Sequence, residues 1–182
     1  EEAWALLARE GVRNAFMPPT ALRLLAQFPA AEGLSLRSVG SAGEALGAGL
    51  LEWGHQALGL TINEFYGQTE CNAVLGNCAE LFAPRPGSTG RAVPGYDVAV
   101  IDSEGNRLPD GEAGELAVAA PNPSLFLEYW GLPEKTEEKF VTSASGIRWM
   151  RTGDEGRRDE DGGFFFSSRT DDVITSSGYR IG

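Results

Sequence analysis

Three short polar stretches of this sequence combine side chains that can bind and polarise a ligand. YGQTE occupies residues 66–70, SAGEALG occupies residues 41–47, and RTGD occupies residues 151–154. The first two follow predicted strands, and the third includes a predicted tight turn. Because open α/β sheets bind ligands beyond the carboxyl ends of their strands, such peptides are candidates for a binding crevice.

The YGQTE stretch offers the widest range of chemistry. The ring of Tyr66 can stack on a planar heterocycle, and Gly67 leaves space where a side chain would block a pocket. Thr69 can donate a hydrogen bond to an anionic oxygen, and Glu70 can ligate Mg²⁺. The same residues are also typical of a capped turn in which Thr69 and Glu70 open a helix. Spacing alone leaves both interpretations open.

The other two stretches suit parts of the same kind of ligand. The small residues of SAGEALG allow the backbone to approach a flat ligand closely, although they also suit a simple strand-to-helix turn. Asp154, at the end of RTGD, can accept hydrogen bonds from two vicinal hydroxyls of a ribose. Its structural alternative is a β-turn that carries a solvated carboxylate.

Composition excludes several function classes. The formal net charge is −11, from 26 acidic and 15 basic residues in a chain of 182, and no Lys or Arg run indicates a nucleic-acid or anionic-membrane partner. No apolar run approaches the ~18 residues of a membrane span. Cys71 and Cys78 fit neither a zinc site nor a disulfide-rich module, which predicts a reducing, cytoplasmic setting and a packing role. The single histidine, His55, is interpreted as an ordinary surface residue.

The elements that must position these residues change in character along the chain. Up to about residue 86, short strands alternate with amphipathic helices, which predicts an α/β fold with a helix-covered, mostly parallel sheet. Beyond it, Pro, Gly and β-branched residues predict an antiparallel, β-rich subdomain. The expected elements of the first part are helices over 2–9, from 18 onward and over 46–58, and strands over 12–17, 36–39 and 61–65.

Together, SAGE, EFYGQTE and RTGD, followed by RTDDVI and SGYRIG, resemble the adenylate-forming superfamily, and within it the acyl-CoA synthetases of the AMP-binding family. The resemblance covers nearly the whole chain. It implies part of a large N-terminal domain, divided into an α/β part at 1–86 and a β-rich part at 87–168, with a hinge and the start of a small C-terminal domain at 169–182. The chain lacks an initiator Met and stops after SGYRIG, which indicates an internal piece of a longer protein.

The resemblance also implies a role for each matching residue. Gly43, Glu44 and Ala45 would pack on one side of adenine and Tyr66 on the other, with Glu64 near the exocyclic amine. Thr69 would lie near the α-phosphate, and Glu70 would bind Mg²⁺. The remaining implied nucleotide contacts are Phe65, Gly67, Gln68, and, at the ribose, Asp154 and Arg169.

The last residues of the chain match family positions with other roles. Asp171 corresponds to the hinge about which the C-terminal domain rotates between the half-reactions. Ser177, Gly178 and Arg180 match positions that approach coenzyme A. Ser168 occupies a position that is usually Gly in the family, so a positive φ angle there would be strained.

The implied reaction uses ATP, Mg²⁺, a carboxylic acid and coenzyme A. The carboxylate is first adenylated, and the acyl group then passes to the thiol. Gly67, where acetate-specific relatives carry Trp, favours a medium-chain or aromatic acid. The phosphate loop and the adenylation lysine of the family are expected outside these residues, so the isolated chain is predicted to be inactive. The alternatives are a domain that loads a carrier-protein thiol, and a non-catalytic nucleotide-binding module.

Overall fold

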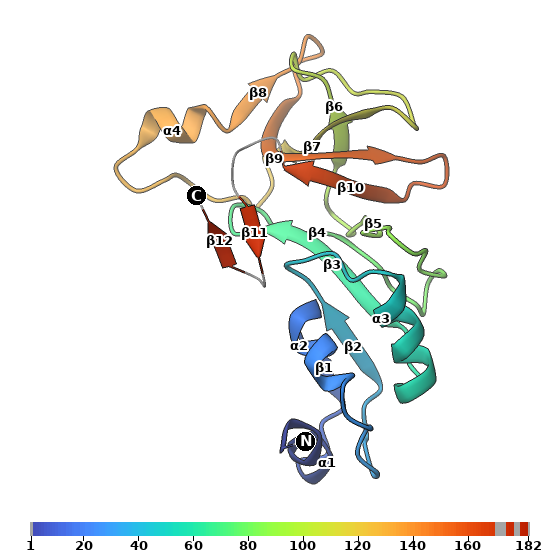
Figure 1. Cartoon of the computed structure of the whole chain (residues 1–182). Coiled ribbons are helices and arrows are strands. Elements are labelled where there is room, and N and C mark those ends of the chain that lie inside the picture. Colours follow the sequence, from blue (N-terminus) through green and yellow to red (C-terminus); the bar gives the residue numbers. More distant parts are fainter. Residues whose placement is uncertain (1, 170–173, 177–178, 182) are drawn as a thin grey trace. The chain divides into compact units, whose positions relative to one another are not determined.

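The computed structural model describes residues 2–169, 174–176 and 179–181 (Figure 1). The chain divides into two compact units. Unit 1 contains Glu1–Phe65, Asn77–Gly87 and Ile174–Gly182, and unit 2 contains Tyr66–Gly76 and Ser88–Val173.

Unit 1 alternates helices with parallel strands, as the sequence predicts. Strand β1 pairs in parallel with β2, and β2 pairs in parallel with β3. A proline opens helix α2 near its N-terminus, where a missing N–H costs nothing. The elements are α1 (Glu2–Arg9), β1 (Asn14–Phe16), α2 (Pro19–Leu25), β2 (Ser38–Ser41), α3 (Ala48–Trp53), the π-helix η1 (Gly54–Leu58) and β3 (Ile62–Gln68), whose last three residues belong to unit 2.

The core of unit 1 joins the helices to one face of the strands. Leu22 of α2 and Leu50 of α3 pack with Val39 of β2 and Ile62 of β3. Val39 and Ile62 are register partners, so their side chains lie on the same face. Two residues farther along each strand, Ser41 and Glu64 are also register partners and are also buried. The same face is therefore apolar in its middle and polar at its carboxyl end.

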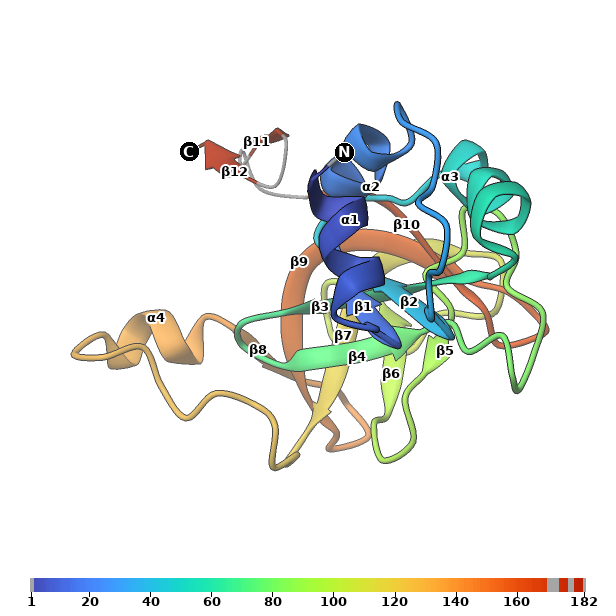
Figure 2. The ribbon, with the colours of Figure 1, turned by 90° about the horizontal axis from the view of Figure 1, so that it is seen from below.

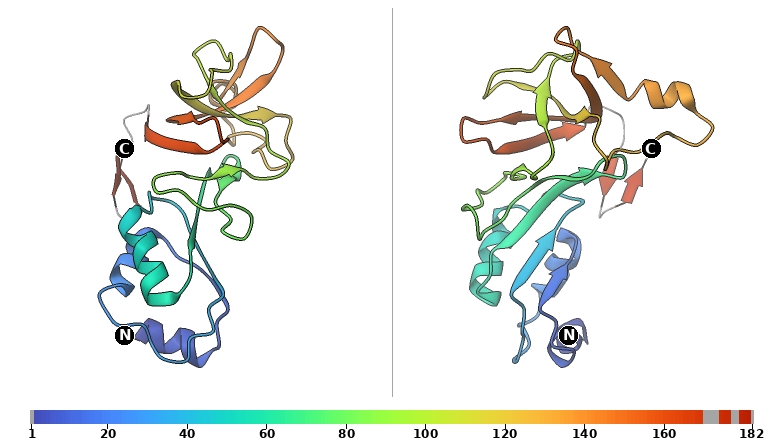
Figure 3. Two further views of the ribbon diagram at one scale, coloured as in Figure 1. Left: turned by 90° about the vertical axis from the view of Figure 1, so that its right-hand side faces the viewer. Right: turned by 180° about the vertical axis from the view of Figure 1, so that it is seen from behind.

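Unit 2 is an antiparallel β structure. Its main sheet has the order β10-β9-β7-β6, with β8 paired to β9, and β4 pairs with β5. Helix α4 stands away from this sheet on the segment that follows β7 (Figure 3). The elements are β4 (Asn72–Gly76), β5 (Arg91–Ala92), β6 (Val98–Ile101), β7 (Ala113–Ala120), α4 (Pro133–Glu137), β8 (Phe140–Thr142), β9 (Arg148–Arg158) and β10 (Phe164–Arg169).

Unit 2 buries side chains on both faces of its main sheet. Val100, Leu116, Met150 and Phe164 pack on one face together with residues of β4, and Trp149 anchors a smaller cluster with Ile101. The alternation of Trp149 and Met150 between the two clusters is what the two-residue period of a strand requires. Two short strands that belong to unit 1, β11 (Ile174–Ser176) and β12 (Tyr179–Ile181), pair with each other in antiparallel fashion.

Two of the chemically important stretches lie within strands, which corrects the sequence-based assignment. Strand β3 continues through Gln68, so the first three residues of YGQTE are strand, and Thr69 and Glu70 form a turn before β4 without opening a helix. RTGD lies inside β9, where the register with β7 shifts, instead of forming a free turn. The strand bends strongly along its length (Figure 2). A bulge of this kind adds residues to one strand and redirects side chains locally.

Smaller differences concern element ends. The predicted helix over 46–58 begins at Ala48 and changes to a π-helix at Gly54, and the strand predicted over 36–39 is Ser38–Ser41. Among the described residues, no helix combines the length and the apolar character that crossing a bilayer requires.

A matched pair of leucines in α2 tests the core of unit 1. Leu22 is fully buried and Leu24 is 58% exposed. Leu22→Ala should lower the free energy of unfolding by about 2–5 kcal/mol because it leaves a cavity. Leu24→Ala should change it by about 0.5 kcal/mol or less. Urea unfolding followed by tryptophan fluorescence and circular dichroism measures both, and equal losses would contradict this packing.

Candidate functional site

The carboxylate of Asp154 is buried in unit 2 and well hydrogen-bonded. It is 3% exposed and accepts hydrogen bonds from three side chains. The Tyr66 hydroxyl and the Gln68 amide both donate to Oδ2 at 2.6 Å. Arg169 donates to Oδ1 at 2.8 Å, in an ion pair that is largely buried. A buried carboxylate requires such partners, because leaving it unpaired would cost several kcal/mol.

The bulge of β9 fixes the position of this carboxylate. Gly153 has a φ of 75°, a conformation that L side chains rarely adopt. Its N–H donates to the carboxylate of Glu115 on β7 at 2.8 Å. The Thr152 hydroxyl donates to the carbonyl of Leu116 and accepts from the backbone N–H of Asp154. Strand β7 therefore holds the RTGD backbone at two neighbouring residues.

Tyr66 combines a partly buried ring with an anchored hydroxyl. Its ring lies 6.4 Å from that of Phe166, centroid to centroid. Burial, and then the negative charge of Asp154, raise the pKa of Tyr66 far above its ordinary value. The hydroxyl therefore stays protonated and acts as a donor. The backbone of the strand carries Tyr66 and Gln68 on the same side, because residues i and i+2 point to one face.

Glu70 has a different environment from Asp154. Its Oε1 accepts a hydrogen bond from the hydroxyl of Tyr129 at 2.7 Å, and its backbone carbonyl accepts one from the N–H of Phe126. Among the described residues, no Lys or Arg forms an ion pair with it. Mg²⁺ is usually held by one or two carboxylates together with phosphate oxygens and water, so one oriented carboxylate suits it.

In unit 1, the SAGE stretch forms the connection between β2 and α3. Gly43 has a φ of 96°, which explains why glycine is needed there. The carboxylate of Glu44 accepts hydrogen bonds from Thr20 at 2.8 Å and from Arg23 at 3.1 Å, both on α2. Helix α2 thereby fixes the loop that holds Gly43, Glu44 and Ala45.

Glu64 carries a buried and weakly hydrogen-bonded carboxyl group in unit 1. Its side chain is 7% exposed, and its Oε1 accepts one long hydrogen bond, from the N–H of Leu46 at 3.4 Å. Burial raises the pKa of Glu64 to about 7. Its register partner Ser41 carries a fully buried hydroxyl with no hydrogen-bond partner in the described structure. This edge of the sheet therefore presents two buried polar groups with unused hydrogen-bonding capacity.

Gly67 was predicted to leave space for a ligand. In the structure, the position that a side chain at 67 would take is occupied by the backbone of Asn72. A methyl group at Gly67 would overlap the carbonyl oxygen of Asn72 and lie 2.7 Å from its carbon. Asn72 has a φ of 65°, a left-handed conformation that asparagine tolerates better than most residues. Glycine is required at 67 because the turn brings this backbone against it.

The remaining polar candidates have ordinary surroundings. Cys71 is fully buried in the core of unit 2, and burial raises its pKa to about 11, which confirms the predicted packing role. Both cysteines are free thiols. His55 is exposed and contacts the hydroxyl of Thr61. Ser168 lies in β10 and contacts Glu155, and the non-glycine residue with positive φ in the described chain is Asn72, so the expected strain at 168 is not found.

Several predicted residues lie outside the described part of the structure. These are Asp171, Ser177 and Gly178, and Arg180 is described only as backbone within β12. Their predicted roles stay predictions.

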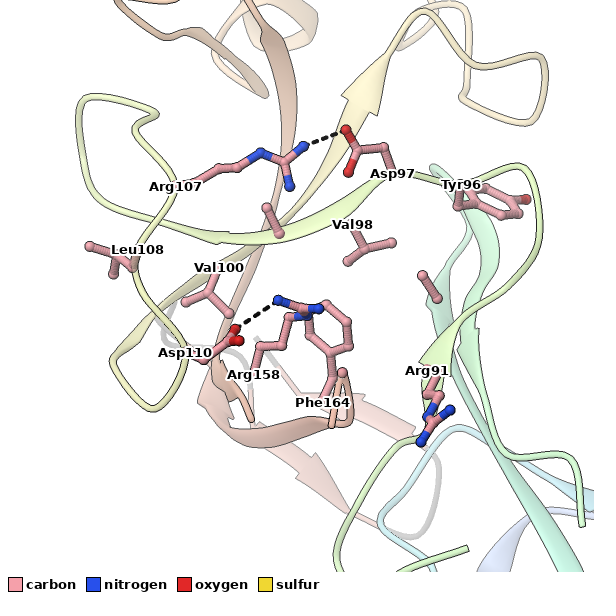
Figure 4. A pocket seen from close by; sticks show the side chains of 13 residues that line it. Arg91, Tyr96, Asp97, Val98, Val100, Arg107, Leu108, Asp110, Arg158 and Phe164 are labelled. Atoms are coloured by element: carbon pink, nitrogen blue, oxygen red, sulfur yellow. Dashed lines mark hydrogen bonds and ion pairs between the residues drawn. The ribbon is translucent and has the colours of Figure 1, made fainter. Parts of the chain in front are cut away.

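A separate pocket of about 390 Å³ opens in unit 2 (Figure 4). Val98, Val100 and Phe164 supply its apolar lining. Two ion pairs border it, Arg107 with Asp97 and Arg158 with Asp110. None of the predicted site residues lines it.

Sequence reasoning missed two supporting residues, Glu115 and Tyr129. Tyr129 lies 59 residues from its partner Glu70, and Glu115 lies 38 residues from Gly153. Neither pair has local spacing that could reveal it. The available signal was indirect, since a Gly inside a strand pattern indicates a bulge that needs outside partners.

The comparison with known families agrees with this arrangement. The sequence profile described as AMP-binding enzyme matches residues 1–130. The chain belongs to the AMP-binding enzyme family. The match includes SAGE and YGQTE and confirms the predicted family, and the structure confirms the α/β fold class that the resemblance implies.

Individual members of the AMP-binding family resemble the chain over most of its length. Acetyl-coenzyme A synthetase of Bacillus subtilis is 35% identical and is matched over 100% of this chain and 32% of that protein. Mitochondrial acyl-coenzyme A synthetase ACSM3 of Mus musculus is 41% identical over 90% of this chain and 28% of that protein. The structure of ATP-bound MatB from Rhodopseudomonas palustris superposes with a TM-score of 0.81 at 29% identity, over 99% of this chain and 35% of that one. The chain thus spans about a third of the length of these relatives.

The buried carboxyl of Glu64 predicts a pH dependence of stability in this family member. The folded state favours the protonated form of Glu64. The contribution of this group to the free energy of unfolding is therefore complete below pH 4.5 and is lost as pH rises through about 7. The total loss should be roughly 3 kcal/mol. Glu64→Gln should remove this slope, whereas Glu32→Gln, at an exposed position, should retain it. Urea unfolding between pH 4 and 8 measures the difference, and parallel curves for wild type and Glu64→Gln would refute it.

A pair of glycine substitutions tests the contact at Gly67. Gly67→Ala should lower the free energy of unfolding by about 1–3 kcal/mol, since the Asn72 backbone must move. Gly49→Ala, in open space on α3, should raise it by up to about 1 kcal/mol through helix propensity. Thermal unfolding of both variants provides the comparison. A neutral Gly67→Ala would mean that the 72–73 backbone adapts freely.

Proposed function

We propose that this chain is the central part of an ATP-dependent acid–CoA ligase that forms AMP. The observation that carries the proposal is the group around Asp154, in which Tyr66, Gln68 and Arg169 converge on one buried carboxylate. The three residues come from two of the stretches that define the resemblance. Membership in the AMP-binding family supplies the nucleotide as the ligand for this group.

Asp154 suits a ribose diol for a simple reason of hydrogen-bond capacity. A carboxylate offers about four lone-pair positions. Three donors already use Oδ1 and Oδ2. One sugar hydroxyl can therefore be accepted directly, and the second displaces or shares with a donor. Arg169 is the group best placed to yield, because its side chain is the more exposed member of the ion pair, and its guanidinium can then contact the sugar.

The base and the phosphates would be bound by the other predicted residues. We assign adenine contacts to Gly43, Glu44 and Ala45 of unit 1. The carboxyl of Glu64 would accept a hydrogen bond from the exocyclic amine, supported by its unused acceptor capacity. In unit 2, the ring of Tyr66 would contact the base, with Phe65, Gly67 and Gln68 as its backbone neighbours.

Thr69 and Glu70 would act at the phosphates. The Thr69 hydroxyl would donate to the α-phosphate. Glu70 would hold Mg²⁺, which supplies charge neutralisation of the phosphate oxygens when bound. The hard oxygen donor of Glu70 and the absence of an ion-paired Lys or Arg at it, among the described residues, support this assignment.

The proposed chemistry has two steps. A carboxylate oxygen attacks the α-phosphorus, the bond to the bridging oxygen breaks, and pyrophosphate leaves. The thiol of coenzyme A then attacks the acyl carbon, loses its proton, and AMP leaves. Neither step requires a protein nucleophile, because positioning and charge stabilisation supply the rate. This agrees with a single exposed histidine and a buried Cys71.

Substrate and setting are proposals with narrower support. Asp171 as hinge, and Ser177, Gly178 and Arg180 at coenzyme A, rest on the resemblance. A medium-chain or aromatic acid also rests on the resemblance, since the contact with Asn72 explains the glycine at 67 without reference to the acid. The two free thiols support a reducing, cytoplasmic compartment.

The full-length protein that carries this chain should release pyrophosphate from ATP and Mg²⁺ in the presence of a suitable acid. Asp154→Asn should lower kcat/KM for ATP by roughly 10- to 100-fold, as expected for losing charged hydrogen bonds. Asp110→Asn, which alters only an exposed ion pair with Arg158, should leave it unchanged. No pyrophosphate with any acid of a broad panel would indicate a non-catalytic module. Transfer to a carrier-protein thiol in place of free coenzyme A would indicate the carrier-loading alternative.

A further inference from the structure

The segment between β7 and α4 makes a double contact with Glu70. The Tyr129 hydroxyl donates to Glu70 Oε1 at 2.7 Å, and the backbone N–H of Phe126 donates to the Glu70 carbonyl at 2.8 Å. All three residues belong to unit 2. One segment therefore restrains both the main chain and the side chain of Glu70.

Tyr129 is itself held in place before any ligand binds. Its N–H donates to the hydroxyl of Thr136 at 2.9 Å, and its carbonyl accepts from the N–H of Leu132. Thr136 is buried in α4, and its hydroxyl donates to the carbonyl of Leu132. The backbone of Tyr129 is thus locked to the first turn of α4.

The ring of Tyr129 is also packed. Its centroid lies 4.8 Å from that of Phe126, which stacks in turn on Phe140 at 6.0 Å. The guanidinium of Arg148 covers Phe140 at 4.1 Å. This row of rings determines where the Tyr129 hydroxyl points, so the hydroxyl can impose an orientation on a more flexible carboxylate.

We propose that Tyr129 is a positioning residue for the cation site at Glu70. Its hydrogen bond holds Oε1 and would leave Oε2 available to a cation that accompanies the triphosphate. Groups that orient metal ligands in this way contribute strongly to metal affinity. The inference rests on the proposed function, because it takes Glu70 as the ligand of the cation.

The test measures cation binding directly. Mn²⁺ would be titrated by electron paramagnetic resonance into the full-length protein saturated with α,β-methylene-ATP. Tyr129→Phe keeps the ring and removes the hydroxyl, and it should weaken Mn²⁺ binding about 10-fold. Tyr96→Phe is the matched control, because its hydroxyl contacts the carbonyl of Cys71, next to Glu70, at 3.4 Å. It should leave Mn²⁺ binding unchanged.

Two further variants keep the result interpretable. Glu70→Gln should abolish the Tyr129→Phe effect, because the hydrogen bond then no longer orients a charged ligand. If Tyr129→Phe fails to fold, Thr136→Val loosens the backbone of Tyr129 and should also weaken Mn²⁺ binding. Unchanged Mn²⁺ affinity in a folded Tyr129→Phe protein, or in Thr136→Val, would overturn the role of Tyr129 and leave the proposed function intact. A wild-type protein that binds neither the nucleotide nor Mn²⁺ would overturn both.

Discussion

The hydrogen bonds to the Asp154 carboxylate are the constraint on which unit 2 depends. They bind the end of β3, the bulge of β9 and the end of β10 to a single buried charge. A carboxylate with so little exposure is stable only when several donors compensate for lost hydration. The same donors therefore fix the chain at three distant points. The side chain that we propose as a ribose ligand is thus also a folding constraint.

The backbone of β9 determines how this strand presents the Asp154 carboxylate. A regular strand would alternate its side chains between the two faces of the sheet. Between the residues of β9 that pair with Glu115 and Ala117, three residues face Leu116 alone, and Gly153 there has a positive φ. Because two residues are added, the alternation of burial continues through the bulge. Asp154 therefore lies on the same buried side of β9 as Thr152, where it contacts Tyr66 and Gln68, and its backbone pairs with Arg169 of β10. The glycine of RTGD is required by this backbone geometry.

Sequence reasoning predicted the parts of the structure that depend on local signals. The proline at the start of α2 and the Pro, Gly and β-branched residues beyond residue 86 are local signals, and the helix and the antiparallel strands that they predict were found. The sequence did not predict that β3 extends through Gln68 or that RTGD lies within β9, because pairing with other strands decides both. Family resemblance supplied Asp154 and Arg169 as partners in function, and the register of β10 against β9 makes them direct neighbours. Tyr129 needed the folded chain, because no local spacing links it to Glu70.

The electrostatics of the acidic candidates distinguish Glu70 from the rest. Asp154 is paired with Arg169, and Glu44 is paired with Arg23. Burial raises the pKa of Glu64 to about 7, so its charge is partly suppressed at neutral pH. Glu70 instead receives a neutral hydroxyl, which orients the carboxylate without cancelling its charge. In a chain with a net charge of −11, this difference is the reason for proposing Glu70, and none of the other three carboxylates, as the ligand of a cation.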